Sequence, residues 1–243
     1  MDMKISGSGS IASGEYKNIS ISGSGRLSGR VRCENLHVSG AAHGDIIECS
    51  EKISVSGSVN FSENTESTVI SVSGSLSAGG NIVAKDKISC SGAIKCGASL
   101  KCAALRVAGK VTVGKDVEAE KVDVDGILNC DGLVNAEEVT IKYHSGMEIG
   151  SIGGSRIVIC KSQSCGKSII RLPLFSSLAG SVMGSVKIKN SIEGDSIAIE
   201  GVTAERVSGR VVAIGEGCKI DFVQYSENIE VSPKARVGRQ EKI

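Results

Sequence analysis

The sequence predicts an all-β protein, a parallel β-helix (solenoid) with about 17 residues per coil. Three observations lead to this prediction. An apolar-x-apolar-x-Gly unit recurs at a nearly constant spacing, polar and apolar residues alternate inside each unit, and aromatic residues make up only 2% of the chain. A repeat this short cannot bury its own apolar face, so each unit has to stack on its neighbours.

The repeat starts near the N-terminus and keeps its phase to about residue 143. Complete units follow one another at a nearly constant interval and begin at Ile19, Leu36, Ile53, Ile70, Ile88, Leu105 and Val122. A weaker copy begins at Met3, and an eighth unit at Val139 carries Tyr143 where the glycine is expected. We therefore expect residues 1–143 to form one regular β-helix.

Each unit is expected to be a strand that ends in a corner. Positions one and three are apolar and the residue between them is mostly polar, which is the alternation of a strand with one buried face. Position five is glycine in seven units, and glycine tolerates positive φ and close backbone approach. Apolar residues return near positions seven and thirteen, so each coil should contain two or three short strands separated by bends.

The repeat becomes hard to follow between residues 144 and 188, where we expect an irregular coil or an apolar loop. Ile157-x-Ile159 fits a displaced coil, but residues 169–188 are apolar and lack the Ser-Gly corners. An exposed apolar loop can mark contact with a membrane or a partner protein. The candidate residues for such a contact are Leu172, Leu174, Phe175 and Leu178.

Residues 189–243 are expected to form further β-helical coils and a polar tail. The steps from Ile197 to Ile214 and from Ile214 to Val231 each equal one length of the repeat, so its spacing is restored. Phe and Tyr are rare in the chain, yet one of each lies near this end. They belong to a candidate surface that either caps the core or mediates self-association, made of Phe222, Val223, Tyr225, Ile229 and Val231.

The composition argues against binding of nucleic acid or nucleotide. The formal net charge is +1 and aromatic residues are scarce, so neither phosphate attraction nor base stacking is favoured. The stretch from Lys161 to Ser168 resembles a phosphate-binding loop, but Lys161 stands where that loop needs glycine, and Pro173 interrupts the helix that should follow. No secretion signal or apolar span opens the chain, so we expect a cytoplasmic protein, with a peripheral position at the inner face of the cell membrane as an alternative.

The nine cysteines are expected to be core residues and not metal ligands. Cys90, Cys96 and Cys102 are evenly spaced within one coil, and Cys33 and Cys130 fall at equivalent positions of other coils. Other coils carry Val, Ala or Ile at these positions. A free cysteine behaves as a small buried hydrophobe, and an odd number of cysteines without a CxxC pair fits a reducing compartment. We expect no metal and no cofactor.

Enzymes that share the β-helix fold form the main alternative class. Hexapeptide-type acyltransferases use a histidine as general base, but their six-residue repeat differs from the spacing found here. The histidines of this chain are His37, His43 and His144, and each is expected to be solvated on the surface. Acidic residues are scattered and do not form the paired carboxylates of a glycosidase.

The repeat resembles that of the bactofilin family, the bacterial polymer-forming cytoskeletal proteins. The resemblance rests on coils such as Ile53-Ser-Val-Ser-Gly57 and Leu105-Arg-Val-Ala-Gly109, and on the phrases Leu27-Ser-Gly-Arg-Val31 and Ser39-Gly-Ala-Ala-His-Gly44. It covers residues 1–143, and the segment Ile214-Gly-Glu-Gly-Cys-Lys-Ile220 is also similar. The shared pattern is one of packing, so it carries no catalytic signature.

The resemblance implies a right-handed β-helix that polymerises end to end without nucleotide. Its polymers would scaffold other proteins, membrane-associated or envelope proteins among them. The expected function is therefore that of a non-enzymatic, nucleotide-independent, polymer-forming cytoskeletal scaffold whose main partner is a second copy of itself. Two alternatives remain open: a hexapeptide-type β-helix acyltransferase, and a monomeric adaptor or binding module.

Overall fold

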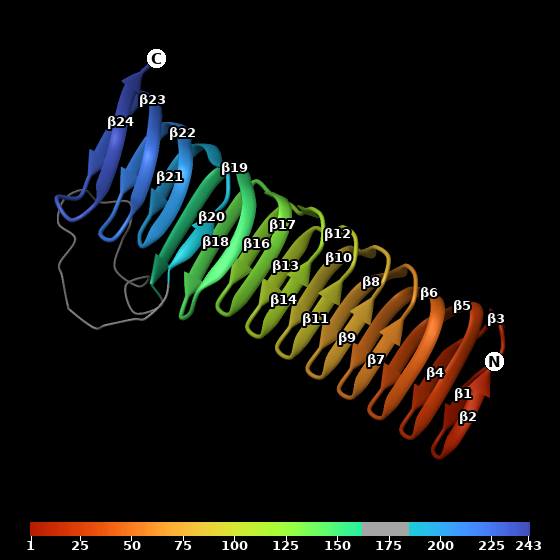
Figure 1. The fold of residues 1–243 in the computed structure, drawn as a ribbon. Helices are drawn as coiled ribbons and strands as arrows, with labels where there is room; N and C mark the ends of the chain where they lie inside the picture. The colour runs from red at the N-terminus through yellow and green to blue at the C-terminus, as the bar shows by residue number, and fades with distance from the viewer. Residues whose placement is uncertain (162–184) are drawn as a thin grey trace. The chain divides into compact units, whose positions relative to one another are not determined.

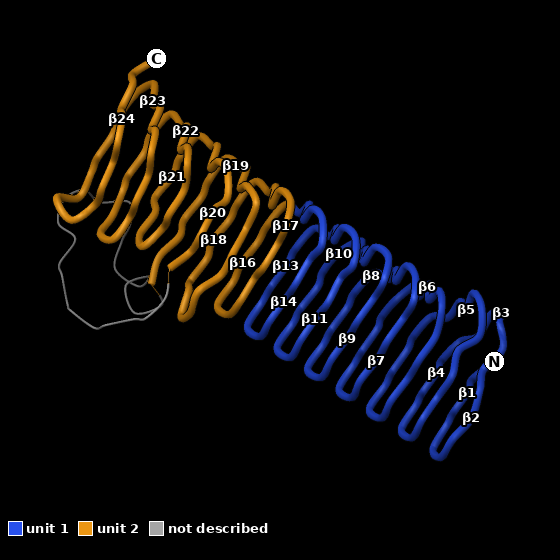
Figure 2. The backbone as a smooth tube through the Cα atoms, viewed as in Figure 1, with its two compact units in different colours: residues 1–119 blue, residues 120–243 orange. Residues whose placement is uncertain are grey.

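The computed structural model describes residues 1–161 and 185–243, and every regular element among these residues is a β-strand. The chain divides into two compact units, Met1–Ala119 and Glu120–Ile243 (Figure 2). In each unit the strands stack in parallel register, and Figure 1 shows them in chain order. The predicted parallel β-helix with about 17 residues per coil is confirmed.

The strands of the first unit follow one another around each coil, and most are short, although β5 and β6 each have 15 residues. They are β1 (Met3–Ile5), β2 (Ser8–Ile11), β3 (Gly14–Glu15), β4 (Asn18–Ile21), β5 (Ser24–Val38), β6 (Ala41–Val55), β7 (Ser58–Phe61), β8 (Thr65–Val72), β9 (Ser75–Ala78), β10 (Ile82–Cys90), β11 (Ala93–Cys96), β12 (Leu100–Lys101), β13 (Ala104–Val107), β14 (Lys110–Val113) and β15 (Val117–Glu118).

The second unit also contains both short and long strands, the longest being β19 with 15 residues. They are β16 (Lys121–Val124), β17 (Ile127–Asn135), β18 (Glu138–Tyr143), β19 (Met147–Lys161), β20 (Val186–Ile188), β21 (Ser191–Ile199), β22 (Val202–Ile214), β23 (Lys219–Val231) and β24 (Arg236–Lys242).

The first unit keeps the register that the sequence predicts. Met3 pairs with Ile19, Ile19 pairs with Leu36, and each later start of the repeat pairs with the next as far as Leu105. Inward side chains are buried and alternate with more exposed outward side chains along the strands. Stacked inward residues therefore form apolar columns, and these columns are the core.

One phenyl ring fits into a column of this core because its neighbours are small. Phe61 is 1% exposed and pairs with Gly44 in the coil before it and with Ala78 in the coil after it. A Cβ atom on Gly44 would lie 3.2 Å from the Phe61 ring. A large side chain between two small ones keeps the core filled at the density that close packing requires.

The second unit contains regular coils in part of the segment that the sequence predicts to be irregular. Residues 147–161 form β19 in place of an irregular coil, and Ile157 pairs with Val139 before it and with Ile197 after it. The displaced coil expected at Ile157-x-Ile159 is thus present. Residues 162–184 fall in the sequence between these two paired strands, and the structure does not describe them.

The end of the second unit differs from expectation in two respects. Ile197 pairs with Val212, while Ile214 pairs with Ile199, because this coil is shorter than the repeat of the first unit. The polar tail is a strand: residues 236–242 form β24, which pairs with β23. Its polarity fits its place, since it is the last described strand of the stack and most of its side chains face solvent.

Candidate assembly surfaces at the terminal coils

The strands of the first coil pair with another described strand on one side only. Among the described residues, β1 pairs with β4, while β2 and β3 pair with β5. The other side of these strands presents backbone N–H and C=O groups, and a sheet edge of this kind can pair with another chain. We call this side of β1 and β2, together with the corner at Gly7, the N-terminal edge.

Beyond Lys4 of β1, the N-terminal edge lacks the charges that usually protect an open strand. Proteins commonly place Lys, other charges or Pro on an edge strand to prevent pairing. Residues 5–14 contain no charged residue and no proline, and they are mostly Ser, Gly, Ala and Ile. Sequence reasoning directed at the C-terminal aromatic residues missed this surface, although the uncharged run was the available signal.

Glycines at the coil corners form a ladder that runs through the first unit. Ala41 N donates a 2.8 Å hydrogen bond to Gly23 O in the preceding coil, and Ser58 N donates a 2.9 Å bond to Gly40 O. These carbonyls lie so near the next corner that a Cβ atom on Gly40 or Gly57 would come well under 3.0 Å from them. Close backbone approach, and not positive φ, therefore requires glycine here, since neither residue has a positive φ.

Gly7 is the first corner glycine of this ladder, but within the chain no neighbouring atom requires glycine at its position. A Cβ atom on Gly7 would meet nothing within 4 Å. By the geometry of the ladder, that Cβ would point toward the place where a preceding coil would put its carbonyl. The first coil thus carries a corner that fits a further coil beyond it.

The last coil presents a second open edge. Residues 228–231 of β23 pair with β22, and β24 pairs with β23. Ile229, Val231 and Val237 occupy inward positions of this coil, and Val231 is 36% exposed. We call the outer side of residues 228–231 and of β24 the C-terminal edge. Its outward positions are charged, unlike those of residues 5–14, through Glu230, Lys234, Arg236, Arg239, Glu241 and Lys242.

The five residues predicted as one self-association surface do not lie together. Val223 is fully buried in the core, and Ile229 and Val231 lie at the C-terminal edge. Phe222 and Tyr225 are half-buried in the strand before this edge, each paired with a residue of β24. Only two of the five are therefore placed where an additional coil could contact them directly.

Phe222 faces outward and lies between two arginines. Arg206 in the preceding coil and Arg239 in the following coil place their guanidinium carbons 5.6 Å and 5.3 Å from its ring centre. This is the geometry of a cation–π contact. Arg206 also donates a hydrogen bond to Gln224, and Arg239 donates a 3.1 Å bond to Glu241. The ring therefore stabilises the side of the last coils and does not cap the core.

The residues predicted to contact a membrane or a partner lie outside the described residues. These are Leu172, Leu174, Phe175 and Leu178. Within residues 1–161 and 185–243, no helix is long and apolar enough to cross a membrane.

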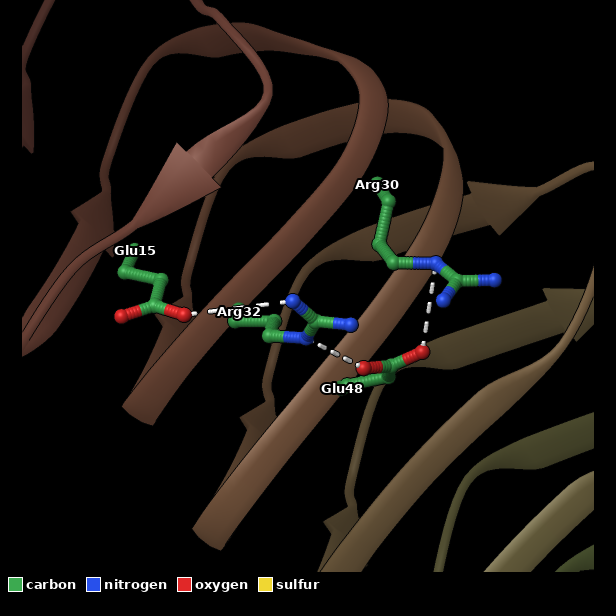
Figure 3. Close-up of polar contacts among 4 residues, drawn as sticks. All are labelled: Glu15, Arg30, Arg32 and Glu48. Carbon is green, nitrogen blue, oxygen red and sulfur yellow. Dashed lines mark hydrogen bonds and ion pairs between the residues drawn. The ribbon is translucent and has the colours of Figure 1, made fainter.

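An ion-pair ladder joins the first coils on one outward face (Figure 3). Glu48 lies 2.8 Å from Arg32 Nε and 3.4 Å from Arg30 Nε, while Arg32 also approaches Glu15 at 3.9 Å. The hydrogen bond and the charge of Glu48 raise the pKa of Arg32 above its ordinary value. In the sequence, this ladder shows only as opposite charges about one repeat length apart. That spacing identifies ion pairs only once the register of the coils is known.

The eight described cysteines lie in the core, as predicted, and Cys165 lies outside the described residues. Cys90, Cys96, Cys102 and Cys130 are all buried. Burial raises the pKa of the Cys90 thiol to about 11 and that of Cys102 to about 12, which keeps both thiols protonated and poorly reactive. Among the described residues, no group of three or more His, Cys, Asp and Glu side chains could hold a metal ion.

Tyr143, which replaces a corner glycine, is a buried tyrosine whose hydroxyl has no hydrogen-bond partner among the described residues. The side chain is 0% exposed and its hydroxyl lies against Gly201, which has a positive φ of 64°. Burial raises the pKa of this hydroxyl, and the charge of Glu200 raises it further. The residue is thus held in its neutral form and fills space that Gly201 leaves open.

The histidines lie on the surface, as expected. His37 and His43 are exposed on outward positions of the first unit. His144 Nε2 lies 2.7 Å from Asp125 Oδ1, with 58% and 51% of the two side chains exposed. Among the described residues of the second unit, this is the one contact between an imidazole and a carboxylate.

Comparison with known proteins finds relatives but no assigned activity. No family profile and no solved structure matches the chain. It is similar to two uncharacterized proteins of Bacillus subtilis strain 168. YhbF is 28% identical over 113 residues, which are 46% of this chain and 42% of that protein. YhbE is 30% identical over 112 residues, 46% of this chain and 44% of that protein. The chain therefore spans less than half the length of either relative.

Proposed function

We propose that this protein is a non-enzymatic scaffold that polymerises through its terminal coils without nucleotide. The observation that carries the proposal is the pair of open coil edges, one of which is uncharged over residues 5–14. An unprotected strand edge is a template for another chain. A contact between two different ends of a molecule generates open filaments when it does not close into a ring.

The resemblance to bactofilins supports the same proposal from the repeat pattern. We propose that the polymer is cytoplasmic, with a peripheral place at the inner face of the cell membrane as the alternative. Its main partner would be a second copy of the chain, and membrane-associated or envelope proteins would bind along the polymer.

Electron microscopy of the purified chain tests this function directly. Filaments or sheets should form without nucleotide, and their number and length should not change when ATP or GTP is added. Uniform single particles at every protein concentration and ionic strength would contradict the proposal.

A hexapeptide-type acyltransferase is the second candidate, and the contact between His144 and Asp125 favours it. A carboxylate that orients an imidazole is the arrangement of a general base. Calorimetric titration with an acyl-coenzyme A would test it. Binding to the wild type, together with acyl transfer that is lost in His144→Ala, would support the enzyme. If the wild type neither binds the acyl-coenzyme A nor transfers its acyl group, the contact between His144 and Asp125 is a surface contact without a catalytic role.

A further inference from the structure

We infer that Cys33 and Cys49 form a dithiol that hydrogen peroxide converts into a disulfide between two neighbouring coils. The inference goes beyond the proposed function and does not depend on assembly. Three observations support it: the two sulfur atoms are in contact, the strands that carry them are paired in register, and the hydrogen bond between the thiols favours reaction at Cys33 first.

The two thiols lie side by side in the first unit. Cys33 in β5 pairs with Cys49 in β6, and their Sγ atoms are 3.0 Å apart. The thiol of Cys90, by contrast, donates to a backbone oxygen, with its Sγ 3.4 Å from Gly92 O. An S–S bond between Cys33 and Cys49 requires the two sulfur atoms to approach to about 2.0 Å.

The backbone at this pair has the spacing that a disulfide needs. Neighbouring strands lie about 4.8 Å apart, which is inside the range of about 4.4 to 6.8 Å between the Cα atoms of a disulfide. The register of β5 and β6 shifts between Cys33 and Asn35, and that of β6 and β8 shifts between Glu48 and Lys52. Regular pairing is thus interrupted beside both cysteines, which lets the strands make the small movement that closes the bond.

An ion-pair network joins the same two strands beside the thiols (Figure 3). Arg32 precedes Cys33 and pairs with Glu48, which precedes Cys49, and Arg32 Nε donates a 2.8 Å hydrogen bond to the Glu48 carboxylate. Arg30 Nε lies 3.4 Å from the other oxygen of that carboxylate. Because side chains alternate along a strand, these contacts lie on the outward face and the thiols point inward next to them. The register that brings the sulfur atoms together is therefore supported from outside.

Access to the two sulfur atoms is narrow and suits a small oxidant. Cys33 and Cys49 are each 6% exposed, whereas Cys90 is 1% exposed. A bulky disulfide such as oxidised glutathione does not fit through so small an opening, but hydrogen peroxide is little larger than water. Cys102 is 5% exposed, so it serves as a comparison of nearly equal access.

The hydrogen bond between the thiols makes Cys33 the one that reacts first. With Cys49 as donor, the bond stabilises the thiolate of Cys33 and lowers its pKa below the ordinary value of 9.0. The same bond, together with burial, raises the pKa of Cys49. The thiolate is the form that attacks peroxide, and a second thiol beside it resolves the product. Cys33 is thus the attacking thiol and Cys49 the resolving thiol.

The reaction balances with one molecule of peroxide. The Cys33 thiolate attacks a peroxide oxygen, so that an S–O bond forms and the O–O bond breaks, and the departing hydroxide takes up the proton that Cys33 lost. Cys49 then attacks the sulfur of the Cys33 sulfenic acid, so that the S–S bond forms and the S–O bond breaks. The second hydroxide leaves with the proton of Cys49. Two electrons pass from the sulfur atoms to the peroxide, which becomes two molecules of water.

Peptide mapping of the full chain tests the bond. Trypsin cleaves after Arg32 and after Lys52, so both cysteines fall in the peptide of residues 33–52. After peroxide treatment this peptide should lose both alkylation sites and the mass of two hydrogen atoms, and dithiothreitol should restore both sites. The peptide that begins at Cys102 should stay fully alkylated at the same dose. A peptide 33–52 that stays alkylated, or that gains oxygen without losing hydrogen, would overturn the inference.

Two variants test the order of the steps. Cys49→Ser keeps a hydrogen-bond donor but has no resolving sulfur, so Cys33 should accumulate as a sulfenic acid that dimedone labels. Cys33→Ser removes the attacking thiol, so Cys49 should stay unlabelled. Label on Cys49 in the second variant, with none on Cys33 in the first, would contradict the assignment of attacking and resolving thiols.

The stability of the wild type keeps the test decisive if a variant does not fold. A bond between residues that are 16 positions apart restricts the unfolded chain, so the oxidised protein should unfold at a higher urea concentration than the reduced protein. Dithiothreitol should reverse this shift. An oxidised protein with an equal or lower urea midpoint would show that the folded coils do not accommodate the bond. These outcomes concern the dithiol alone, whereas a wild type that never assembles would refute the proposed function alone.

Discussion

At the residue scale, the fold depends on a few positions where a side chain would meet backbone. The corner glycines of the first unit are packed against the carbonyl oxygens of the preceding corner. The sequence revealed their spacing, but two explanations were open, positive φ and close approach. The structure selects close approach, because the described glycines with positive φ are Gly14, Gly29, Gly201 and Gly217, and none of these belongs to the ladder.

Gly57→Ala should therefore destabilise the fold strongly. The added methyl group would overlap the Gly40 carbonyl, and a backbone atom cannot move away as a side chain can. We expect a loss of about 3 kcal/mol or more in the free energy of unfolding, measured by urea denaturation. Gly7→Ala is the matched control and should leave the monomer unchanged, since its methyl group would meet nothing within 4 Å. Equal losses in the two variants would contradict the close-approach account.

Tyr143 and Gly201 should behave as a coupled pair. A methyl group on Gly201 would overlap the Tyr143 hydroxyl, and the backbone there has a φ of 64°. Tyr143→Phe removes a buried hydroxyl that has no partner in residues 1–161 and 185–243, and it should stabilise the protein by about 1 kcal/mol. The cost of Gly201→Ala should be smaller in the Tyr143→Phe background than in the wild type. Strictly additive changes in a double-mutant cycle would show that the two residues do not interact.

Cys102 should make the stability of the protein fall at alkaline pH. In the unfolded chain its thiol loses its proton near the ordinary pKa of 9.0, whereas burial raises the folded pKa to about 12. Between these values the unfolded state binds fewer protons, so the free energy of unfolding decreases by about 1.4 kcal/mol per pH unit for this group. Denaturation from about pH 8 to about pH 10 should show a shallower decrease in Cys102→Val. Parallel pH profiles would contradict the assignment.

At the element scale, the coil is the unit that the sequence specifies. Each strand of the first unit could be placed because Ile19, Leu36 and their equivalents repeat the same inward position, and a shift of one residue would turn all of them outward. The coils after Tyr143 were harder to place because the corner glycine is replaced and the step from Ile157 to Ile197 spans residues 162–184. The polar β24 could not be recognised by alternation, since most of its side chains face solvent.

The candidate site was predicted less completely than the fold. The C-terminal end was identified through Phe222 and Tyr225, yet the residues at the open edge are Ile229 and Val231. Burial of Val223 and the stacking of Phe222 between two arginines depend on neighbours one coil away. A single sequence does not give those neighbours until the register is known.

Amide exchange should identify the edges that assemble. Outward-pointing N–H groups of β1 and of residues 228–231 have no strand partner among the described residues, so they should exchange quickly in dilute solution. Their exchange should slow as the protein concentration rises, because another copy would then supply the partner. Amides of β7 inside the first unit should be protected at all concentrations. Concentration-independent exchange at both edges would argue against stacking.

At the scale of the whole molecule, assembly follows from how a solenoid ends. A stack of coils buries its apolar columns only where another coil follows, so the first and last described coils each leave one side of these columns uncovered. Here residues 5–14 of the N-terminal edge carry no charge, and the C-terminal edge exposes Val231. The proposed scaffold needs no chemistry beyond the strand pairing and apolar burial that already hold the coils together.

Sedimentation velocity of the full chain over a concentration series, without nucleotide, tests the proposed polymerisation most directly. The account predicts a 25.0 kDa species at low concentration that converts into a broad series of larger species as the concentration increases. The conversion should be reversible on dilution, because no covalent step is involved. A single 25.0 kDa species at every concentration and ionic strength would contradict it.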